Sequence, residues 1–121
     1  MKKIMFAALM AIAFLTAAAR PISYIEQTPS WIYLYDENGK KFQSLSSSIG
    51  LVVGYSSEIF VVVSHNWVYV YNSEGKKITS LSASSVGEVL GVTGNTFTSR
   101  NGNWIYTWDK SGKKINTRSA R

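Results

Sequence analysis

The sequence predicts an all-β protein made of tandem four-stranded antiparallel units of about 36 residues, preceded by a signal peptide. The first observation is a motif that occurs three times, starting at Trp31, Trp67 and Trp104 with spacings of 36 and 37 residues. A fixed period of this size is typical of repeat architectures. The second is that aromatic and aliphatic residues alternate after each tryptophan, which is the period of a β-strand. The third is an Asx-x-x-Gly turn after each of these strands, which closes a hairpin.

Residues 1–19 have the pattern of a secretory signal peptide. Two lysines precede an apolar run from Ile4 to Leu15, and three alanines at 17–19 supply the small residues of a cleavage site. The alternative is a buried or amphipathic first helix. The run is short for a membrane span and no second one follows, so we expect no transmembrane segment in the mature chain. The protein is therefore expected to be secreted or periplasmic, with a repeat β domain at residues 20–121.

Two strands, a turn and a return strand are expected from residue 23 onward. Residues 23–28 are expected to form an extra first strand that ends before Pro29, since proline is tolerated at a strand end. Residues 31–35 form the next strand. Its apolar residues alternate on both faces, which predicts that both faces are covered. Residues 36–39 (Asp-Glu-Asn-Gly) then form the turn, with a positive φ at the glycine, and a return strand follows.

Two further strands complete each unit. A serine-rich connection follows the return strand at residues 46–48 and again at 82–85. The strands after it begin at Gly50 and Gly87, where glycine marks a bend or a close approach of backbone. The fourth strands are expected at residues 59–64 and 96–100, with Phe60 and Phe97 in the same place.

The strand count predicts self-association. Units are expected near 31–66 and 67–103, with a partial unit at 104–121 and the extra strand at 23–28, which makes eleven strands. Both ends would then expose unpaired backbone groups along a sheet edge. A second copy can complete the unfinished unit, and two chains would supply a ring of about six units. We therefore expect a homo-oligomer; the alternative is a monomer whose edges are shielded by lysines.

The repeat has a structural resemblance that concerns architecture alone. A four-stranded meander of this length resembles a compact β-propeller blade. The Trp strand followed by Asp-x-x-Gly-Lys is also similar to the short Trp-Gly-type repeats of secreted bacterial proteins. The chain departs from those repeats because no glycine follows Trp31, Trp67 or Trp104. The resemblance covers residues 23–118 and implies no active site.

The sequence contains no convincing catalytic or metal-binding constellation. His65 is the only histidine, and there is no cysteine. A nucleophilic triad needs a serine and an acid beside the histidine, and no spacing in the sequence indicates one. The acids Asp36, Glu74 and Asp109 are explained by turns, and no phosphate-binding glycine loop opens a helix. We expect no catalytic residue, no metal and no cofactor; a hydrolase using His65 is a third hypothesis.

The repeated aromatic residues are the first candidate for a binding site. Period 2 places three aromatic residues on one face of each Trp strand. They are Trp31, Tyr33 and Tyr35, then Trp67, Tyr69 and Tyr71, then Trp104, Tyr106 and Trp108. One interpretation is that they are buried between adjacent sheets. The other is that part of each triplet lines a groove and stacks on sugar rings, whose hydroxyls can bond the indole N–H and phenol O–H.

The repeated lysine pairs are the second candidate. A pair follows each turn glycine, and the repeat should place the pairs along one rim of the molecule. The pairs are Lys40 and Lys41, Lys76 and Lys77, and Lys113 and Lys114. They either maintain solubility and protect exposed strand edges or form a basic rim for anionic glycans or a membrane surface.

These observations predict a secreted, non-catalytic binding protein for a glycan or an anionic surface polymer. The alternative is a protein-interaction or structural role outside the cytoplasm, such as an inhibitor, an immunity factor or an assembly subunit. Nucleic acid is not an expected partner, even though the formal net charge is +6, because export would separate the protein from it.

Overall fold

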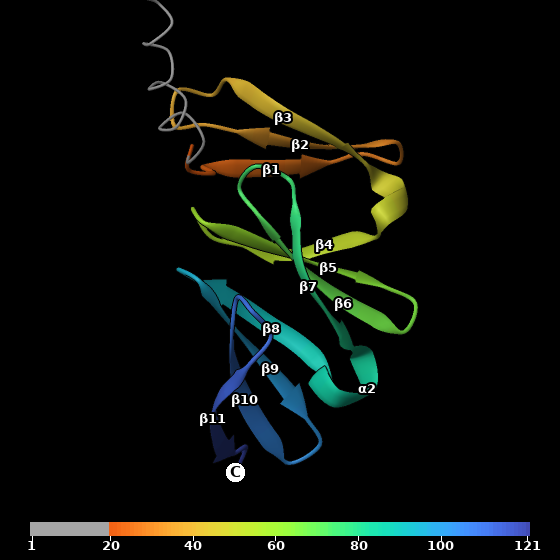
Figure 1. The fold of residues 1–121 in the computed structure, drawn as a ribbon, viewed down its shortest axis with the longest axis vertical. Helices are drawn as coiled ribbons and strands as arrows, with labels where there is room; N and C mark the ends of the chain where they lie inside the picture. Colours follow the sequence, from red (N-terminus) through yellow and green to blue (C-terminus); the bar gives the residue numbers. More distant parts are fainter. Residues whose placement is uncertain (1–19) are drawn as a thin grey trace, which may run out of the picture.

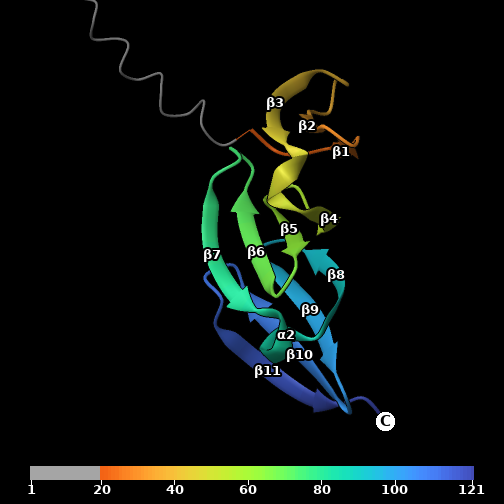
Figure 2. The same ribbon diagram turned by 90° about the vertical axis from the view of Figure 1, so that its right-hand side faces the viewer.

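The computed structural model describes residues 20–121 (Figures 1 and 2). Within this range, eleven strands form three antiparallel sheets, which confirms the all-β class and the predicted strand count. The expected signal peptide, residues 1–19, lies outside the described residues. No helix within residues 20–121 is long and apolar enough to cross a membrane.

Each sheet is a simple meander of consecutive strands. The first sheet contains β1 (Tyr24–Gln27), β2 (Trp31–Tyr35) and β3 (Lys41–Ser46). The second contains β4 (Leu51–Tyr55), β5 (Ile59–Ser64), β6 (Trp67–Asn72) and β7 (Lys77–Ser82). The third contains β8 (Glu88–Thr93), β9 (Thr96–Asn101), β10 (Trp104–Asp109) and β11 (Lys114–Ser119).

The strands are grouped differently from the predicted units. The serine-rich connections form η2 (Ser47–Ile49) and α2 (Ala83–Val86), and each leads from the last strand of one sheet to the first strand of the next. The second and third sheets therefore begin at the glycine-containing strand, not at the Trp strand. The expected unfinished unit at the C-terminal end is wrong, because β10 and β11 complete a four-stranded sheet. Within residues 20–121 the first sheet is the incomplete one, since it has no strand equivalent to β4 and β8 there.

The Asx-x-x-Gly turns have the predicted geometry. In the first turn, Asp36 Oδ1 accepts hydrogen bonds from the backbone N–H groups of Asn38 at 2.9 Å and Lys40 at 3.0 Å. These backbone bonds, that of Lys40 first, lower the pKa of the Asp36 carboxyl. Gly39 has φ +77°, a conformation that glycine adopts without steric cost. The turns at Asn72 and Asp109 repeat the same two hydrogen bonds.

The three sheets stack face to face along the long axis of the molecule (Figure 1). Between the first and second sheets, aliphatic residues of β1 and β2 pack on aromatic residues of β5 and β6. This core cluster includes Ile25, Ile32, Leu34, Phe60 and Tyr71. A second cluster repeats the arrangement, with valines of β5 and β6 packed on Phe97 and Trp108 of the third sheet. The aliphatic face of each sheet is therefore covered by the aromatic face of the next.

The first sheet is covered on one face only, among the described residues. Ile32 and Leu34 are completely buried against the second sheet. On the opposite face Tyr24 is 53% exposed, whereas Phe60 and Phe97 at the equivalent positions of the other sheets are completely buried. The prediction that both faces of this strand are covered is therefore wrong for the described chain. The face is open because no sheet precedes the first one within residues 20–121.

Glycines occur where backbone segments come close together, as predicted. Gly50 and Gly87 follow the two helical connections with φ +133° and +82°. A Cβ at Gly87 would overlap the carbonyl oxygen of Arg100, and one at Gly50 would overlap that of Val63. At Gly54 on β4, a Cβ would lie 2.8 Å from Val92 Cγ2 on β8. The first strands of the second and third sheets therefore approach each other too closely for a side chain at this position.

Valine in the Asx-x-x-Gly turns should destabilise the protein, and more so in the second turn. Both Gly39→Val and Gly75→Val place a β-branched residue at positive φ, which costs about 1–3 kcal/mol. A Cβ added at Gly75 would lie 3.4 Å from the Leu45 side chain, whereas one added at Gly39 would have nothing within 4 Å. Urea denaturation should therefore rank Gly75→Val as the less stable variant. Wild-type stability in both variants would contradict the turn assignment.

Candidate ligand-binding site

The aromatic triplets lie on equivalent strands, and their exposure falls along each strand. The first member is half exposed in every sheet: Trp31 by 46%, Trp67 by 48% and Trp104 by 50%. The middle tyrosines, Tyr33, Tyr69 and Tyr106, are of intermediate exposure. The third member is buried in the second and third sheets and of intermediate exposure in the first. In the second and third sheets the last member of the triplet is therefore buried, as the first interpretation predicts, while the tryptophan is exposed.

The third members are buried because they stack on aromatic residues of the neighbouring strand. The Tyr71 ring lies 5.1 Å from the Phe60 ring, and the planes differ by 11°. Trp108 stacks on Phe97 at 6.0 Å, and its Nε1–H donates a 2.9 Å hydrogen bond to Ser99 Oγ. Burial raises the pKa of the Tyr71 hydroxyl. These two residues belong to the core, so they are not available to a ligand.

The three tryptophans at the start of β2, β6 and β10 form the candidate site, called here the tryptophan row. In each sheet the tryptophan is opposite a serine of the adjacent strand: Ser46, Ser82 and Ser119 respectively. This small polar neighbour places a hydroxyl beside the indole, which remains half exposed. Trp31 also stacks on Tyr33, with ring centroids 6.4 Å apart. Equivalent positions in stacked sheets give a row of similar indoles along the molecule.

The two lysines of each pair have different surroundings, although all six are exposed. The second lysine of each pair lies over the ring of the middle tyrosine of the triplet. The distances from Nζ to the ring centroid are 4.0 Å for Lys41 and Tyr33, 4.4 Å for Lys77 and Tyr69, and 3.8 Å for Lys114 and Tyr106. This cation–π contact stabilises an exposed sheet by about 0.5–1 kcal/mol. The first lysines, Lys40, Lys76 and Lys113, are exposed beside the turns.

Two residues of the open first-sheet face were not among the predicted site residues. Tyr24 is 53% exposed and lies opposite Tyr35, at the position of Phe60 and Phe97 in the other sheets. Glu26 accepts a 2.9 Å hydrogen bond from the Tyr35 hydroxyl, and this bond raises the pKa of Tyr35. Aligning the first strand with the two later phenylalanines would have identified Tyr24. Its exposure could not be predicted, because it depends on how the sheets stack.

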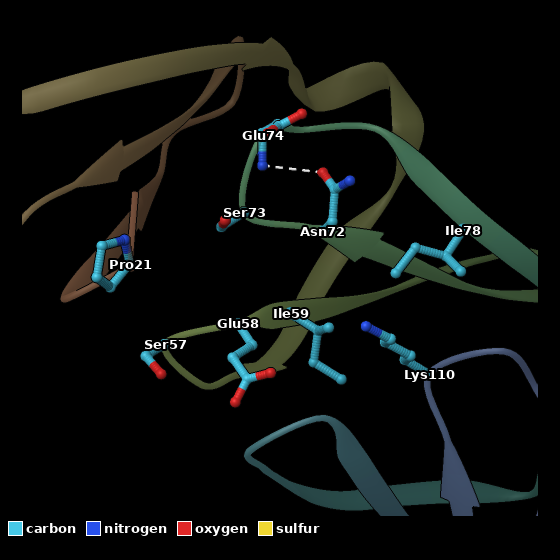
Figure 3. A pocket seen from close by; sticks show the side chains of 9 residues that line it. All are labelled: Pro21, Ser57, Glu58, Ile59, Asn72, Ser73, Glu74, Ile78 and Lys110. Atoms are coloured by element: carbon cyan, nitrogen blue, oxygen red, sulfur yellow. Dashed lines mark hydrogen bonds between the residues drawn. The ribbon is translucent and has the colours of Figure 1, made fainter. Parts of the chain in front are cut away.

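A cavity of about 370 Å³ lies where turns of the second and third sheets meet the start of the described chain (Figure 3). Figure 3 shows Ile59, Ile78 and the Lys110 amino group gathered on one side of it. Asn72 also lines the cavity, but its side-chain oxygen already accepts the Glu74 N–H at 2.9 Å. None of the predicted site residues lines this cavity. Within residues 20–121, no group of three His, Asp or Glu residues is placed to hold a metal ion.

His65 occupies a turn and not a cluster of reactive groups. It follows β5 with φ +52°, and it is the only non-glycine residue with positive φ among residues 20–121. Gly102 has φ +63° in the corresponding turn of the third sheet. The position therefore requires left-handed backbone, which explains the local geometry of His65 without a chemical role.

Comparisons with known proteins show a shared fold. No family model matches the sequence, and neither does any curated protein. The chain is similar in structure to KlHsv2, solved in a form with loop 6CD replaced by a Gly-Ser linker, with a TM-score of 0.54 and 14% identity. The match covers 76% of this chain but 32% of KlHsv2, so this chain spans about a third of that protein's length. At this identity, the likeness is one of all-β architecture.

Proposed function

We propose that this protein is a secreted, non-catalytic binding protein that recognises a polymeric glycan through the tryptophan row. One observation carries the proposal: Trp31, Trp67 and Trp104 keep almost the same exposure, 46–50%, while the other aromatic residues of the same three strands are of intermediate exposure or buried. Exposing an indole has a free-energy cost that burial would remove. Repetition of that exposure in three sheets is better explained by a ligand than by incomplete packing.

The chemistry of the row suits sugar rings. An indole offers a flat apolar face to the C–H groups of a pyranose and an N–H donor to its hydroxyls. The opposing serines Ser46, Ser82 and Ser119 add hydroxyl groups of the kind that bond to sugars. Stacked sheets pack about 10 Å apart, so equivalent tryptophans would contact successive parts of a long ligand. Weak contacts linked in this way produce a much higher combined affinity.

The lysines support a weaker preference for anionic polymers. Lys41, Lys77 and Lys114 are engaged with tyrosine rings, although an ammonium above a ring still contributes positive potential. Lys40, Lys76 and Lys113 remain exposed and close to the hairpin turns. We therefore propose that charge increases the association rate and that the tryptophans provide most of the affinity. Added salt would weaken binding to an anionic polymer more than binding to a neutral one.

The proposal includes a propeller-like arrangement of the three sheets. Each four-stranded meander packs its aliphatic face on the aromatic face of the next, and β4 and β8 approach closely at Gly54 and Val92. Sheets that converge at their first strands are arranged as propeller blades are. In such an arrangement, the tryptophan row repeats around the outside of the molecule.

Truncating tryptophans of the row should weaken glycan binding. The test is affinity electrophoresis through gels that contain either a neutral or an anionic polysaccharide, with Trp67→Ala and Trp104→Ala. A stacking contact contributes about 0.5–1.5 kcal/mol, so each variant should raise Kd about two- to tenfold. Tyr55→Ala is the matched control, because Tyr55 is 36% exposed but lies at the opposite end of the second sheet. Equal migration of wild type and both Trp variants in every gel would contradict the proposal.

A further inference from the structure

The open face of the first sheet differs from its counterparts in exposure. This first-sheet face carries Tyr24, Glu26, Trp31, Tyr33 and Tyr35. The positions of Tyr24 and Glu26 correspond to Phe60 and Val62 in the second sheet, which are completely buried. In the third sheet they correspond to Phe97 and Ser99, also completely buried. The aromatic face is covered in the second and third sheets, each of which follows another sheet in the stack. In the first sheet it is open among the described residues 20–121.

The opposite end of the stack carries an equally open face with a different composition. In the first two sheets the corresponding positions are mostly Ile, Leu and Val, and they form the core. In the third sheet they are polar or basic, apart from Ile105. This last-sheet face consists of Thr98, Arg100, Ile105, Thr107, Asn116 and Arg118. Arg100, Asn116 and Arg118 are exposed, and the other three are of intermediate exposure.

We propose that the last-sheet face of one copy covers the first-sheet face of a second copy, head to tail. The relation between the first and second sheets is repeated between the second and third. If the same packing relation is applied once more after the third sheet, the aromatic first-sheet face of a second copy lies on Arg100 and Arg118. Tyrosine, tryptophan and arginine are the residues enriched in protein interfaces. A guanidinium packs well on an aromatic ring, and Glu26 supplies an opposite charge.

The hairpin turns indicate the register of this contact. Gln43 on β3 donates a 2.7 Å hydrogen bond to the Glu74 carbonyl in the turn of the next sheet. In that turn, Gly75 packs on Gln43 and Leu45, and Gly112 packs on Thr79 and Leu81 in the third sheet's turn. The equivalent residues of the last-sheet face are Asn116 and Arg118. In the proposed pair, they would lie under the partner's Asp36–Gly39 turn.

This turn has a suitable shape and charge for such a contact. Nothing lies within 4 Å of a Cβ at Gly39, in contrast to Gly75 and Gly112. The turn also contains Asp36 and Glu37, while the corresponding pairs are Asn72 and Ser73, and Asp109 and Lys110. The most acidic of the three turns would therefore meet Arg118. Its side chain is long enough to reach the Glu37 carboxylate, and Asn116 would donate to a turn carbonyl as Gln43 does.

Two copies joined in this way would close a ring. Each chain contributes three sheets, so two head-to-tail contacts enclose six, which is within the range of closed propellers. No strand is exchanged between chains, in contrast to the assembly expected from the sequence. The tryptophan row would remain accessible, since Trp67 and Trp104 are half exposed even though their sheets are covered.

Charge-reversal variants of the two faces, measured separately and then mixed, test the inference. Multi-angle light scattering of the wild-type protein at micromolar concentration should give twice the mass of one chain. Arg118→Glu and Glu37→Lys should each raise the dimer dissociation constant about tenfold or more. Glu37→Lys is a mild change for the turn, because Lys110 occupies the same position in the third sheet. Lys76→Glu is the control for altered charge on an exposed residue, and it should remain dimeric.

Mixing Arg118→Glu with Glu37→Lys should restore a dimer of one chain of each. Both head-to-tail contacts then regain opposite charges, one as Arg with Glu and the other as Glu with Lys. A wild-type monomer at about 100 μM, well above the Kd of a specific pair, would overturn the inference. A dimer that persists in both single variants, or single variants that stay monomeric after mixing with unchanged circular dichroism, would overturn it too. Glycan binding is not measured, so failure here is separate from failure of the proposed function.

Discussion

Gly87→Ala should lower the free energy of unfolding by about 3 kcal/mol or more, as backbone strain and overpacking add together. Gly87 ends α2 with φ +82°, and its N–H donates a 2.8 Å hydrogen bond to the Ala83 carbonyl. A Cβ here would overlap the Arg100 carbonyl oxygen and lie 2.9 Å from Asn101 Cα. Both are backbone atoms of β9, so neither can move without disturbing the third sheet. The melting temperature should fall by more than about 10 °C.

Substitutions at two other glycines separate the contribution of backbone strain from that of overpacking. Gly94→Ala introduces a side chain at φ +57° with nothing within 4 Å, so it measures conformational strain alone. Gly91 lies on β8, the strand that follows Gly87, without positive φ and with free space around it. The free energy of unfolding of Gly91→Ala should therefore stay within about 0.5 kcal/mol of wild type. Thermal unfolding followed by circular dichroism at one protein concentration gives the comparison. If Gly87→Ala melts together with Gly91→Ala, the close approach of the Gly87 backbone to β9 is wrong.

Phe60→Ala should lower the free energy of unfolding by about 3–5 kcal/mol, the usual cost of truncating a buried phenylalanine. Phe60 is completely buried and lies between the first two sheets, where it stacks on Tyr71 at 5.1 Å. The truncation leaves a cavity between β1, β2 and β5 that the flat sheets cannot easily close. It should loosen the first sheet in particular, since this sheet has three strands and one covered face.

Tyr24→Ala is the matched control for this prediction. Tyr24 occupies the position of Phe60 in the first sheet but is 53% exposed. In dilute solution, where a single chain is present, its truncation should cost less than about 1 kcal/mol. Urea denaturation of the two variants gives both values. Equal costs for Phe60→Ala and Tyr24→Ala would mean that the stacking of the sheets is not as described.

The local structure of each repeat could be predicted from the sequence. Aromatic and aliphatic residues alternate with period 2 from Trp31 to Tyr35, and this pattern predicts a strand. The Asp36 side chain and Gly39 together define one turn geometry, because the carboxylate bonds nearby N–H groups and the glycine accepts positive φ. The close approach at Gly50 and Gly87 was also predictable, since glycine provides space that other residues occupy.

The site could be predicted in part. The period identified Trp31, Trp67 and Trp104 as equivalent residues, but two interpretations of their triplets remained open. Exposure of the tryptophan and burial of Tyr71 and Trp108 depend on which sheet lies opposite, and this is a non-local property. Alternation along a strand identifies the face of a residue, and it does not reveal what covers that face.

The sequence by itself determined the number of strands, the turns and the spacing of the tryptophans, because these depend on short-range hydrogen bonding and backbone conformation. Only the tertiary structure decided where one sheet ends and the next begins. A repeat has a period but no natural starting point, so the Trp strand and the glycine strand were equally valid beginnings. The helical connections at Ser47–Ile49 and Ala83–Val86 move the chain out of one sheet and into the next. Within residues 20–121 this choice leaves the first sheet with three strands and its aromatic face open, since burial is settled by packing between distant segments and not by neighbours in the chain.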